Sequence, residues 1–262
     1  MIARVHDLSL LTWVLLLLAG FTAGWVDAVV GGGGLVQLPA LLLVPGLAPV
    51  QALATNKVGS IMGTSTSSIT YARRVHPDFT TAGPMAVAAL AGAVGGAAVA
   101  SHIPASAFKP IILVVLVAVF VYTLLKPTLG EHTALRWEGN RHRVTAAATG
   151  LVIGVYDGML GPGTGTFLVI ALVGVLGYAF LPASALAKIT NFATNLGALI
   201  FFVPAGHVVW PLGLAVGAAN LTGGYLGARM AVARGSRFVR VVFVVVVGAL
   251  IVRLGYDVLR GA

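Results

Sequence analysis

Two motifs in the sequence place an acid one helical turn ahead of a group of glycines inside long apolar runs. They are GWVDAVVGGGGLVQLP, residues 24–39, and GVYDGMLGPGTGTF, residues 154–167. Glycines in this setting predict a break in a membrane helix, where backbone N–H groups become free and a new helix begins with its positive dipole end. Such a helix start binds anions without a charged side chain. The residues that we expect to form an anion site are Gly31, Gly32, Gly33, Gly34 and Gln37 from the first motif, and Gly161, Gly163, Thr164, Gly165 and Thr166 from the second.

A lysine follows each motif inside a later apolar segment. Lys57 lies in ALATNKVGS, residues 52–60, and Lys188 lies in ALAKITNFATN, residues 185–195. A lysine in a membrane segment is costly unless it is paired or faces water, so it marks a functional position by default. The ammonium groups with the neighbouring hydroxyl and amide side chains suit an oxyanion. The candidate substrate-binding residues therefore also include Thr55, Asn56, Lys57, Lys188, Thr190, Asn191 and Asn195. Two other roles stay open for the lysines: snorkelling to the lipid headgroups, or a purely structural ion pair with an aspartate.

Asp27 and Asp157 are the acids of the two glycine motifs. At membrane depth an aspartate can stay protonated, pair with a lysine, or exchange protons between the two faces of the membrane. A cap for backbone N–H groups at the break is the alternative role. Our hypothesis is that Lys57 is a substrate ligand and that Asp27 and Asp157 couple transport to protons.

The two motifs belong to an internal repeat. Asp27 and Asp157 are 130 residues apart, as are the first glycines of the two groups, Gly31 and Gly161. The lysine segments repeat with a slightly different spacing, and so do GAVGGAAVA, residues 92–100, and NLTGGYLGA, residues 220–228. Because the spacing drifts in the loops, a duplicated helical unit is indicated. For the glycines of this last pair we expect helix packing rather than a site.

Each half of the sequence contains five apolar segments. They span about residues 8–30, 35–44, 50–71, 83–101 and 109–126, then 144–160, 164–178, 183–204, 211–230 and 238–256. We therefore expect an all-α integral membrane protein with a first transmembrane repeat at 1–126, a polar linker at 127–143 and a second repeat at 144–262. Since five is odd, the two halves form inverted-topology repeats if every segment crosses. The second segment of each half is too short for a simple helix across about 30 Å of hydrocarbon, so it either crosses with extended glycine-rich backbone or re-enters on one side.

Composition agrees with a multi-pass membrane protein, since 58% of the 262 residues are hydrophobic and 9% are charged. The net charge of +9 comes from basic residues scattered among short loops, which indicates membrane orientation and not nucleic-acid binding. The sequence has no cysteine, no HExxH zinc motif, no GxSxG nucleophile motif and no Walker phosphate loop. We expect no metal or cofactor and no enzymatic activity, with membrane lipid and a small anion as the partners. The oligomeric state stays open.

The basic residues also predict an orientation. With ten crossings and an external N-terminus, most of them fall on the cytoplasmic side, and only Arg4, Lys109, Arg253 and Arg260 fall outside. The cytoplasmic set is Arg73, Arg74, Lys126, Arg136, Arg141, Arg143, Arg229, Arg234, Arg237 and Arg240. This asymmetry favours external termini.

The same motifs carry a family resemblance. GWVDAVVGGGGLVQLPAL, the ALATNK segment, GVYDGMLGPGTGTF and AKITNFATN resemble the repeated signature of the sulfite exporter TauE/SafE family, over about residues 11–254. The resemblance implies a secondary transporter in the cytoplasmic (cell inner) membrane that carries sulfite, sulfoacetate, thiosulfate or an organosulfonate, with protons as the expected coupling ion. A passive anion channel and an intramembrane enzyme are the alternatives.

Overall fold

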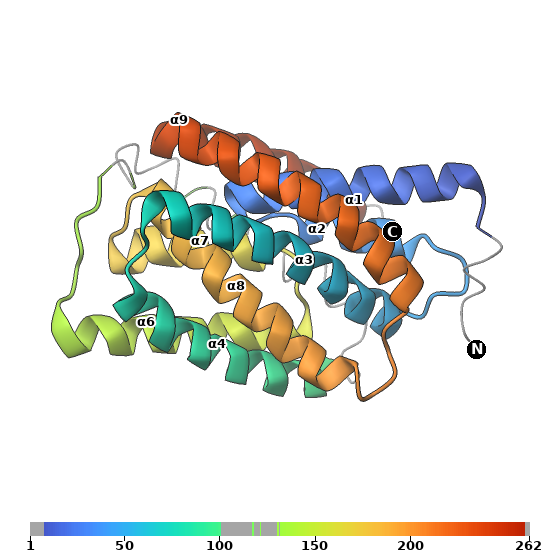
Figure 1. The fold of residues 1–262 in the computed structure, drawn as a ribbon, viewed down its shortest axis with the longest axis horizontal. Helices are drawn as coiled ribbons and strands as arrows, with labels where there is room; N and C mark the ends of the chain where they lie inside the picture. Colours follow the sequence, from blue (N-terminus) through green and yellow to red (C-terminus); the bar gives the residue numbers. More distant parts are fainter. Residues whose placement is uncertain (1–7, 101–116, 118–120, 122–129, 131, 260–262) are drawn as a thin grey trace.

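The computed structural model describes residues 8–100, 117, 121, 130 and 132–259, and every regular element among them is helical (Figure 1). The helices of the first half are α1 (Leu10–Val30), α2 (Gly34–Leu42), α3 (Pro49–Val75) and α4 (Phe79–Ala100). Those of the second half are α6 (Gly139–Met159), α7 (Thr164–Ala171), the π-helix η3 (Leu172–Leu176), α8 (Phe180–Phe202) and α9 (Trp210–Leu259). The all-α prediction is confirmed for these residues.

Helices cover each expected apolar segment that lies within the described residues, whereas the segment at 109–126 falls outside them. The last two segments are joined in α9, which has one non-helical residue at Gly235 (φ 73°, ψ −172°). Helix α6 starts at Gly139, inside the expected linker. Among the described residues, α1, α4 and α8 are long and apolar enough to cross a membrane. Helix α2 has nine residues, or about 14 Å of helix, and is too short to cross alone.

Close packing of small residues joins the two halves along two seams. In the seam between α1 and α9, a Cβ on Gly24 would collide with the backbone of Asn220, and a Cβ on Gly223 would collide with α1. In the seam between α4 and α6, Gly96 and Gly154 approach the facing backbone in the same way. Glycine lets membrane helices come this close and gain van der Waals contact. The packing role expected for the glycines of GAVGG and LTGGYLG is therefore confirmed, except at Gly95, where a Cβ would meet open space.

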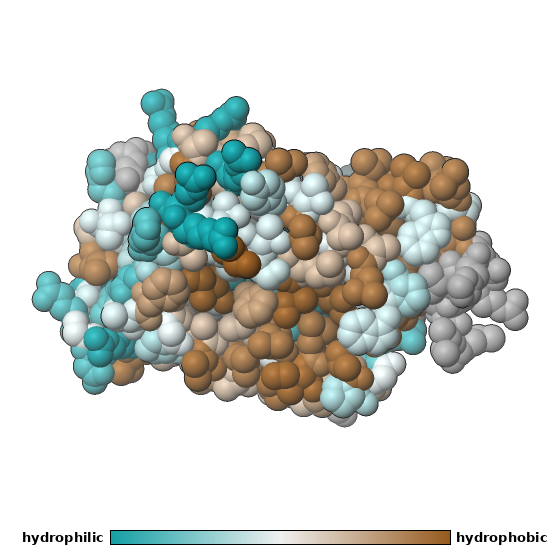
Figure 2. Space-filling model, in the orientation of Figure 1, coloured by the Kyte–Doolittle hydropathy of each residue, from teal (hydrophilic) through white to brown (hydrophobic). Residues whose placement is uncertain are grey.

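The contacts between the halves are reciprocal. The first helix of each half packs on the fourth segment of the other half, as α1 on α9 and α6 on α4, while α3 and α8 also pack against each other. Hydrophobic residues cover most of the face seen in Figure 2, and hydrophilic residues gather at the end where α6 begins and α9 turns. The helices thus present an apolar exterior and place α3 and α8 between the two seams.

A polar cluster links the halves at the start of α4. Asp78 caps this helix by accepting a hydrogen bond from the Thr80 backbone N–H (2.9 Å), and it also accepts one from the Thr81 hydroxyl (2.7 Å). The hydroxyl of Tyr178 donates to Asp78 (3.2 Å), and His142 Nε2 lies 3.0 Å from the Thr81 hydroxyl oxygen. The cluster therefore ties α4 of the first half to α6 and the turn before α8 of the second half.

Candidate functional site

The glycine motifs end one helix and begin another, as their sequence predicts. Gly31 has a φ of 87°, and its N–H donates to the carbonyl of Asp27 and closes α1. Gly161 takes nearly the same conformation, with a φ of 85°, at the end of α6. Residues with a Cβ rarely adopt this left-handed region, so glycine fits both positions. Helices α2 and α7 begin within four residues of these turns, at Gly34 and Thr164.

The two breaks lie in direct contact. The backbone N–H of Thr166 donates to the carbonyl of Gly31 (3.1 Å), and the Thr166 hydroxyl donates to the carbonyl of Val30 (3.2 Å). A Cβ on either Gly31 or Gly165 would collide with the backbone of the other. Non-helical backbone in a membrane needs such internal partners, and each break supplies them to the other.

A small polar cavity lies beside this contact. Its lining residues come from both halves: Asp27, Gly31, Gly34, Asn56, Lys57, Ser60, Asp157, Gly161, Thr164, Gly165, Asn191 and Asn195. The cavity has a volume of about 10 Å³, which is room for about one water molecule. A sulfonate or sulfite ion is larger, so this conformation is closed around the cavity.

Lys57 and Asp157 form one buried ion pair across the halves. Lys57 Nζ lies 2.7 Å from Asp157 Oδ2, and the two side chains are 1% and 2% exposed. The other carboxylate oxygen, Oδ1, accepts a hydrogen bond from the Thr164 hydroxyl (2.6 Å). Lys57 Nζ also lies next to Gly161, where a Cβ would be 3.2 Å away. The ammonium therefore faces the start of α7 from inside the cavity.

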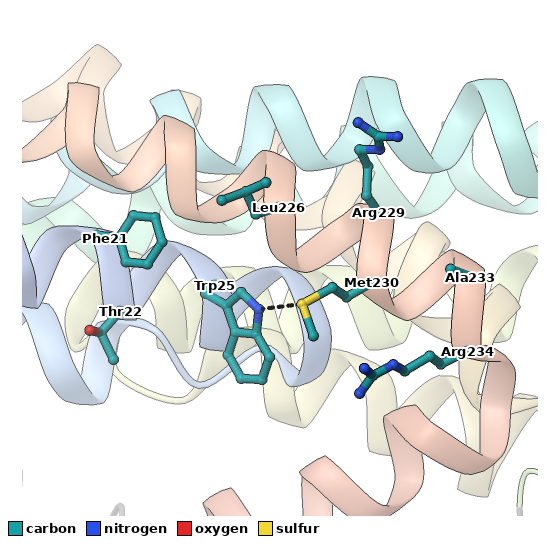
Figure 3. A pocket seen from close by; sticks show the side chains of 8 residues that line it. All are labelled: Phe21, Thr22, Trp25, Leu226, Arg229, Met230, Ala233 and Arg234. Atoms are coloured by element: carbon teal, nitrogen blue, oxygen red, sulfur yellow. Dashed lines mark hydrogen bonds between the residues drawn. The ribbon is translucent and has the colours of Figure 1, made fainter.

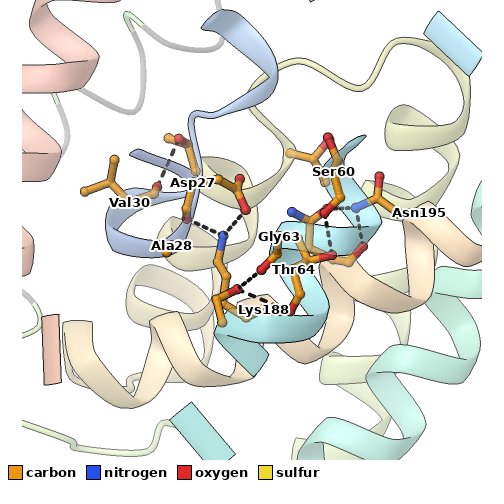
Figure 4. Close-up of polar contacts among 12 residues, drawn as sticks. Asp27, Ala28, Val30, Ser60, Gly63, Thr64, Lys188 and Asn195 are labelled. Atoms are coloured by element: carbon orange, nitrogen blue, oxygen red, sulfur yellow. Dashed lines mark hydrogen bonds and ion pairs between the residues drawn. The ribbon is translucent and has the colours of Figure 1, made fainter. Parts of the chain in front are cut away.

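Lys188 of the second half and Asp27 of the first half form the second ion pair. Lys188 Nζ lies 2.9 Å from Asp27 Oδ2 and also donates to the backbone carbonyl of Asp27 (Figure 4). The Lys188 side chain is buried but is absent from the cavity lining. Because this ammonium binds both a carboxylate and a helix-end carbonyl, it is held at the end of α1 and away from the cavity.

Several predicted residues lie outside the cavity lining and hold the fold around it. The Gln37 amide group donates to the carbonyl of Asn56 (3.1 Å) and accepts from Asn220 (2.6 Å), which links α2, α3 and α9. Thr55 accepts from the backbone N–H of Val209, and Thr190 donates to the carbonyl of Leu186. The other predicted site residues that do not line the cavity are Gly32, Gly33, Gly163, Thr166 and Lys188.

Ser60 lines the cavity but was not among the sequence candidates. The repeat contains a signal that could have found it. Thr55 and Asn56 match Thr190 and Asn191 at a spacing of 135 residues, and the same spacing sets Ser60 against Asn195. Both members of this last pair line the cavity.

The cavity offers one cation, two carboxylates and several neutral polar groups. One of these groups, the buried Asn56 Oδ1 atom, has no hydrogen-bond partner. An amide can turn over and present its NH₂ group instead, so Asn56 can meet a donor or an acceptor. Among the described residues, no group of three or more His, Cys, Asp or Glu side chains could hold a metal ion. The arrangement suits reversible binding of a small anion beside Lys57.

Comparison with known proteins decides the family. The family model for the sulfite exporter TauE/SafE matches residues 16–254. The chain belongs to this family. It is 37% identical to a probable membrane transporter protein ORF9 of Sinorhizobium sp over 97% of this chain and 96% of the relative.

Two further relatives have similar names. A probable membrane transporter protein of Haemophilus influenzae is 30% identical over 96% of this chain and 97% of its own length. The probable membrane transporter protein YfcA of Escherichia coli is 31% identical over 90% of this chain and 86% of its own length. No solved structure matches. The expected family is confirmed, and the protein is a membrane transporter and not an enzyme.

Proposed function

We propose that the protein is a proton-coupled secondary transporter for a small sulfur-containing anion such as sulfite, sulfoacetate, thiosulfate or an organosulfonate. Family membership supports the sulfur-containing substrate class. The observation that carries the proposal is the closed polar cavity where both glycine breaks, Lys57 and Asp157 come together. In this cavity Lys57 and the start of α7 supply positive potential from two directions.

The buried ion pair suggests how protons enter the cycle. An anion that binds Lys57 must sit beside the carboxylate of Asp157, which is 2.7 Å from the ammonium. Protonation of that carboxylate removes the repulsion and frees Lys57 for the substrate. When the substrate leaves, the ionised carboxylate replaces it as the counterion. Anion and proton therefore bind together and leave together, and Asp27 is the matching acid of the other half.

Alternating access follows from the same repeat. We propose that the halves are inverted-topology repeats with the cavity near the middle of the membrane, where equivalent breaks of inverted halves can meet. The reciprocal packing of α1 on α9 and of α4 on α6 supports this relation. Rocking of one half against the other would then open the cavity to each face in turn.

The proposed topology is ten crossings of the cell membrane with both termini outside. The end of α3, the start of α6 and the turn of α9 lie at the same end of the long axis in Figure 1, and most of the expected cytoplasmic arginines lie near them. A C-terminal reporter that fluoresces only in the cytoplasm should stay dark. Bright signal would rule out the ten-crossing topology.

Flux measurements in proteoliposomes test the function. Sulfite, sulfate, thiosulfate, sulfoacetate, taurine and carboxylates are first compared by the thermal shift that each produces in the purified protein. The sulfur anion that stabilises the protein most is then followed with and without a proton gradient. Accumulation driven by the gradient is the expected result. Downhill flux alone would identify a passive channel, and stabilisation by carboxylates alone would overturn the substrate class.

A further inference from the structure

An apolar groove lies on the outside of the α1–α9 seam, away from the substrate cavity. It has a volume of about 620 Å³, within the range of pockets that bind organic ligands. The lining residues are Phe21, Thr22 and Trp25 from α1, and Leu226, Arg229, Met230, Ala233 and Arg234 from α9 (Figure 3). Phe21 and Leu226 are 37% and 41% exposed, so the groove opens on the exterior of the helix bundle.

Two cations stand at one end of this groove. Arg229 and Arg234 are both exposed, and within the described residues neither forms a salt bridge with an acid. Their contacts are aromatic instead. The Arg229 guanidinium lies over Tyr225 at 5.5 Å, and that of Arg234 lies over Phe238 at 4.9 Å. Arg229 Nη1 also donates a hydrogen bond to the Tyr225 hydroxyl (3.2 Å). A guanidinium has five N–H donors, so others can still bind an anion, and its planar fork matches phosphate oxygens.

The rest of the groove is lined mainly by apolar side chains, which suit a hydrocarbon chain. The indole N–H of Trp25 is directed to Met230 Sδ (3.3 Å), so the indole ring and the thioether form a continuous apolar wall. Ala233, with its small side chain, lines the groove near the two arginines. A small sulfur anion could meet the arginines but would leave this wall uncovered. An amphiphile with an anionic head and an acyl chain satisfies both ends.

We propose that this groove binds an anionic phospholipid. The phosphate lies at the end of the groove that carries Arg229 and Arg234, and one acyl chain lies over Trp25 and Leu226 toward Phe21. Charge complementarity favours this occupant, because basic pockets between membrane helices attract anionic lipid headgroups. The arginines lie just before the turn at Gly235, which places the phosphate at the end of the molecule where α9 turns and hydrophilic residues gather.

The test uses the fluorescence of Trp25 in the full-length protein. Trp13, Trp137 and Trp210 are replaced by phenylalanine, and the protein is placed in vesicles in which phosphatidylglycerol or phosphatidylcholine carries brominated acyl chains. The expected result is that brominated phosphatidylglycerol quenches Trp25 at a mole fraction about fivefold lower than brominated phosphatidylcholine does. Equal quenching by the two lipids, or no quenching by either because a second copy covers the groove, would overturn the proposal.

Matched charge variants separate a site from a general surface effect. The double variant Arg229→Gln with Arg234→Gln should lose the preference for phosphatidylglycerol. The control Arg73→Gln with Arg237→Gln removes the same charge from exposed positions outside the groove and should keep it. Arg229→Lys with Arg234→Lys keeps the charge and should retain at least part of the preference, which guards against a folding defect. An equal loss in the control would show that bulk charge and not the groove selects the lipid.

Discussion

The two buried ion pairs are built from equivalent residue types of the two halves, yet they stand in different surroundings. Lys57 meets one carboxylate oxygen of Asp157 inside the cavity, beside the start of α7. Lys188, which does not line the cavity, holds both the carboxylate and the backbone carbonyl of Asp27, which does. Asp157 shares Lys57 with the cavity, so a substrate that enters the cavity can displace it. Asp27 shares Lys188 with its own backbone carbonyl at the end of α1, so displacing it would also disturb that helix end. We therefore propose that the substrate exchanges with Asp157 at Lys57, whereas Lys188 has a supporting role.

The largest effect on substrate binding is expected when Lys57 is replaced by a neutral residue. Lys57→Gln should weaken binding of the preferred sulfur anion by about 100-fold or more, because it removes a charged ligand from a buried site. Lys57→Arg is not expected to rescue binding, since a planar guanidinium is bulkier and fixed in geometry. Affinity is measured by thermal shift in detergent.

Lys188→Gln is the matched control. It should lower the melting temperature, because Asp27 loses its partner, but it should leave binding measurable. Unchanged affinity in Lys57→Gln would remove the ligand assignment, and abolished affinity in Lys188→Gln alone would reverse the two roles.

A substitution at the contact between the two glycine breaks should have the next largest effect, on the stability of the protein. Gly31→Ala places a Cβ in the left-handed region and against the backbone of Gly165, so it should destabilise the protein by about 2 kcal/mol or more. Gly95→Ala is the control, because Gly95 lies within α4 and a Cβ there meets open space. Melting temperatures of both variants check this. Equal stability of the two would mean that the breaks do not depend on their close approach.

Replacing the aspartates with asparagine should change the pH dependence of binding more than the affinity itself. Asp157→Asn and Asp27→Asn are both expected to bind the anion but to lose pH dependence and proton-driven accumulation. The larger change belongs to Asp157→Asn, because that carboxylate faces Lys57 in the cavity. For one linked proton the wild type changes affinity up to about tenfold per pH unit, and the variants should approach zero slope. A wild-type pH profile in both variants would reduce the aspartates to structural caps.

The smallest effect is expected at the polar cluster that joins the halves outside the membrane interior. Burial of Asp78 opposes its ionisation, but hydrogen bonds from Thr80, Thr81 and Tyr178 outweigh burial and lower the pKa to about 2. A lowered pKa in the folded protein stabilises it above the ordinary value of about 3.9 and loses that contribution as the pH falls toward 2.

Asp78→Asn should therefore lower the melting temperature by roughly 2 to 4 °C at pH 7, because asparagine still caps the helix but loses charge-assisted hydrogen bonds of about 1 kcal/mol. The difference from the wild type should shrink at pH 3. Thermal unfolding at the two pH values checks this, and a constant difference would show that the carboxylate charge has no part in joining the halves.

The sequence by itself determined the class of protein and the places where its helices break. Apolar runs and scarce charges require a membrane protein, and a run of four glycines such as Gly31 to Gly34 disfavours a continuous helix, because both are local properties of the chain. The repeat also marked Asp27 and Asp157 as equivalent, since matching residues at a constant spacing are visible without coordinates. The helix boundaries followed closely from the same patterns.

Only the tertiary structure decided which charges meet. Lys57 pairs with an aspartate 100 residues away and Lys188 with one 161 residues away, and both pairs join opposite halves. Periodicity cannot assign such partners, because they depend on how α3 and α8 pack between the seams. The same packing turned Gln37 toward Asn220 and set Ser60 into the cavity. The types of the side chains identified the candidate site residues in the sequence. Long-range packing separated the candidates that face the cavity from those that hold it in place.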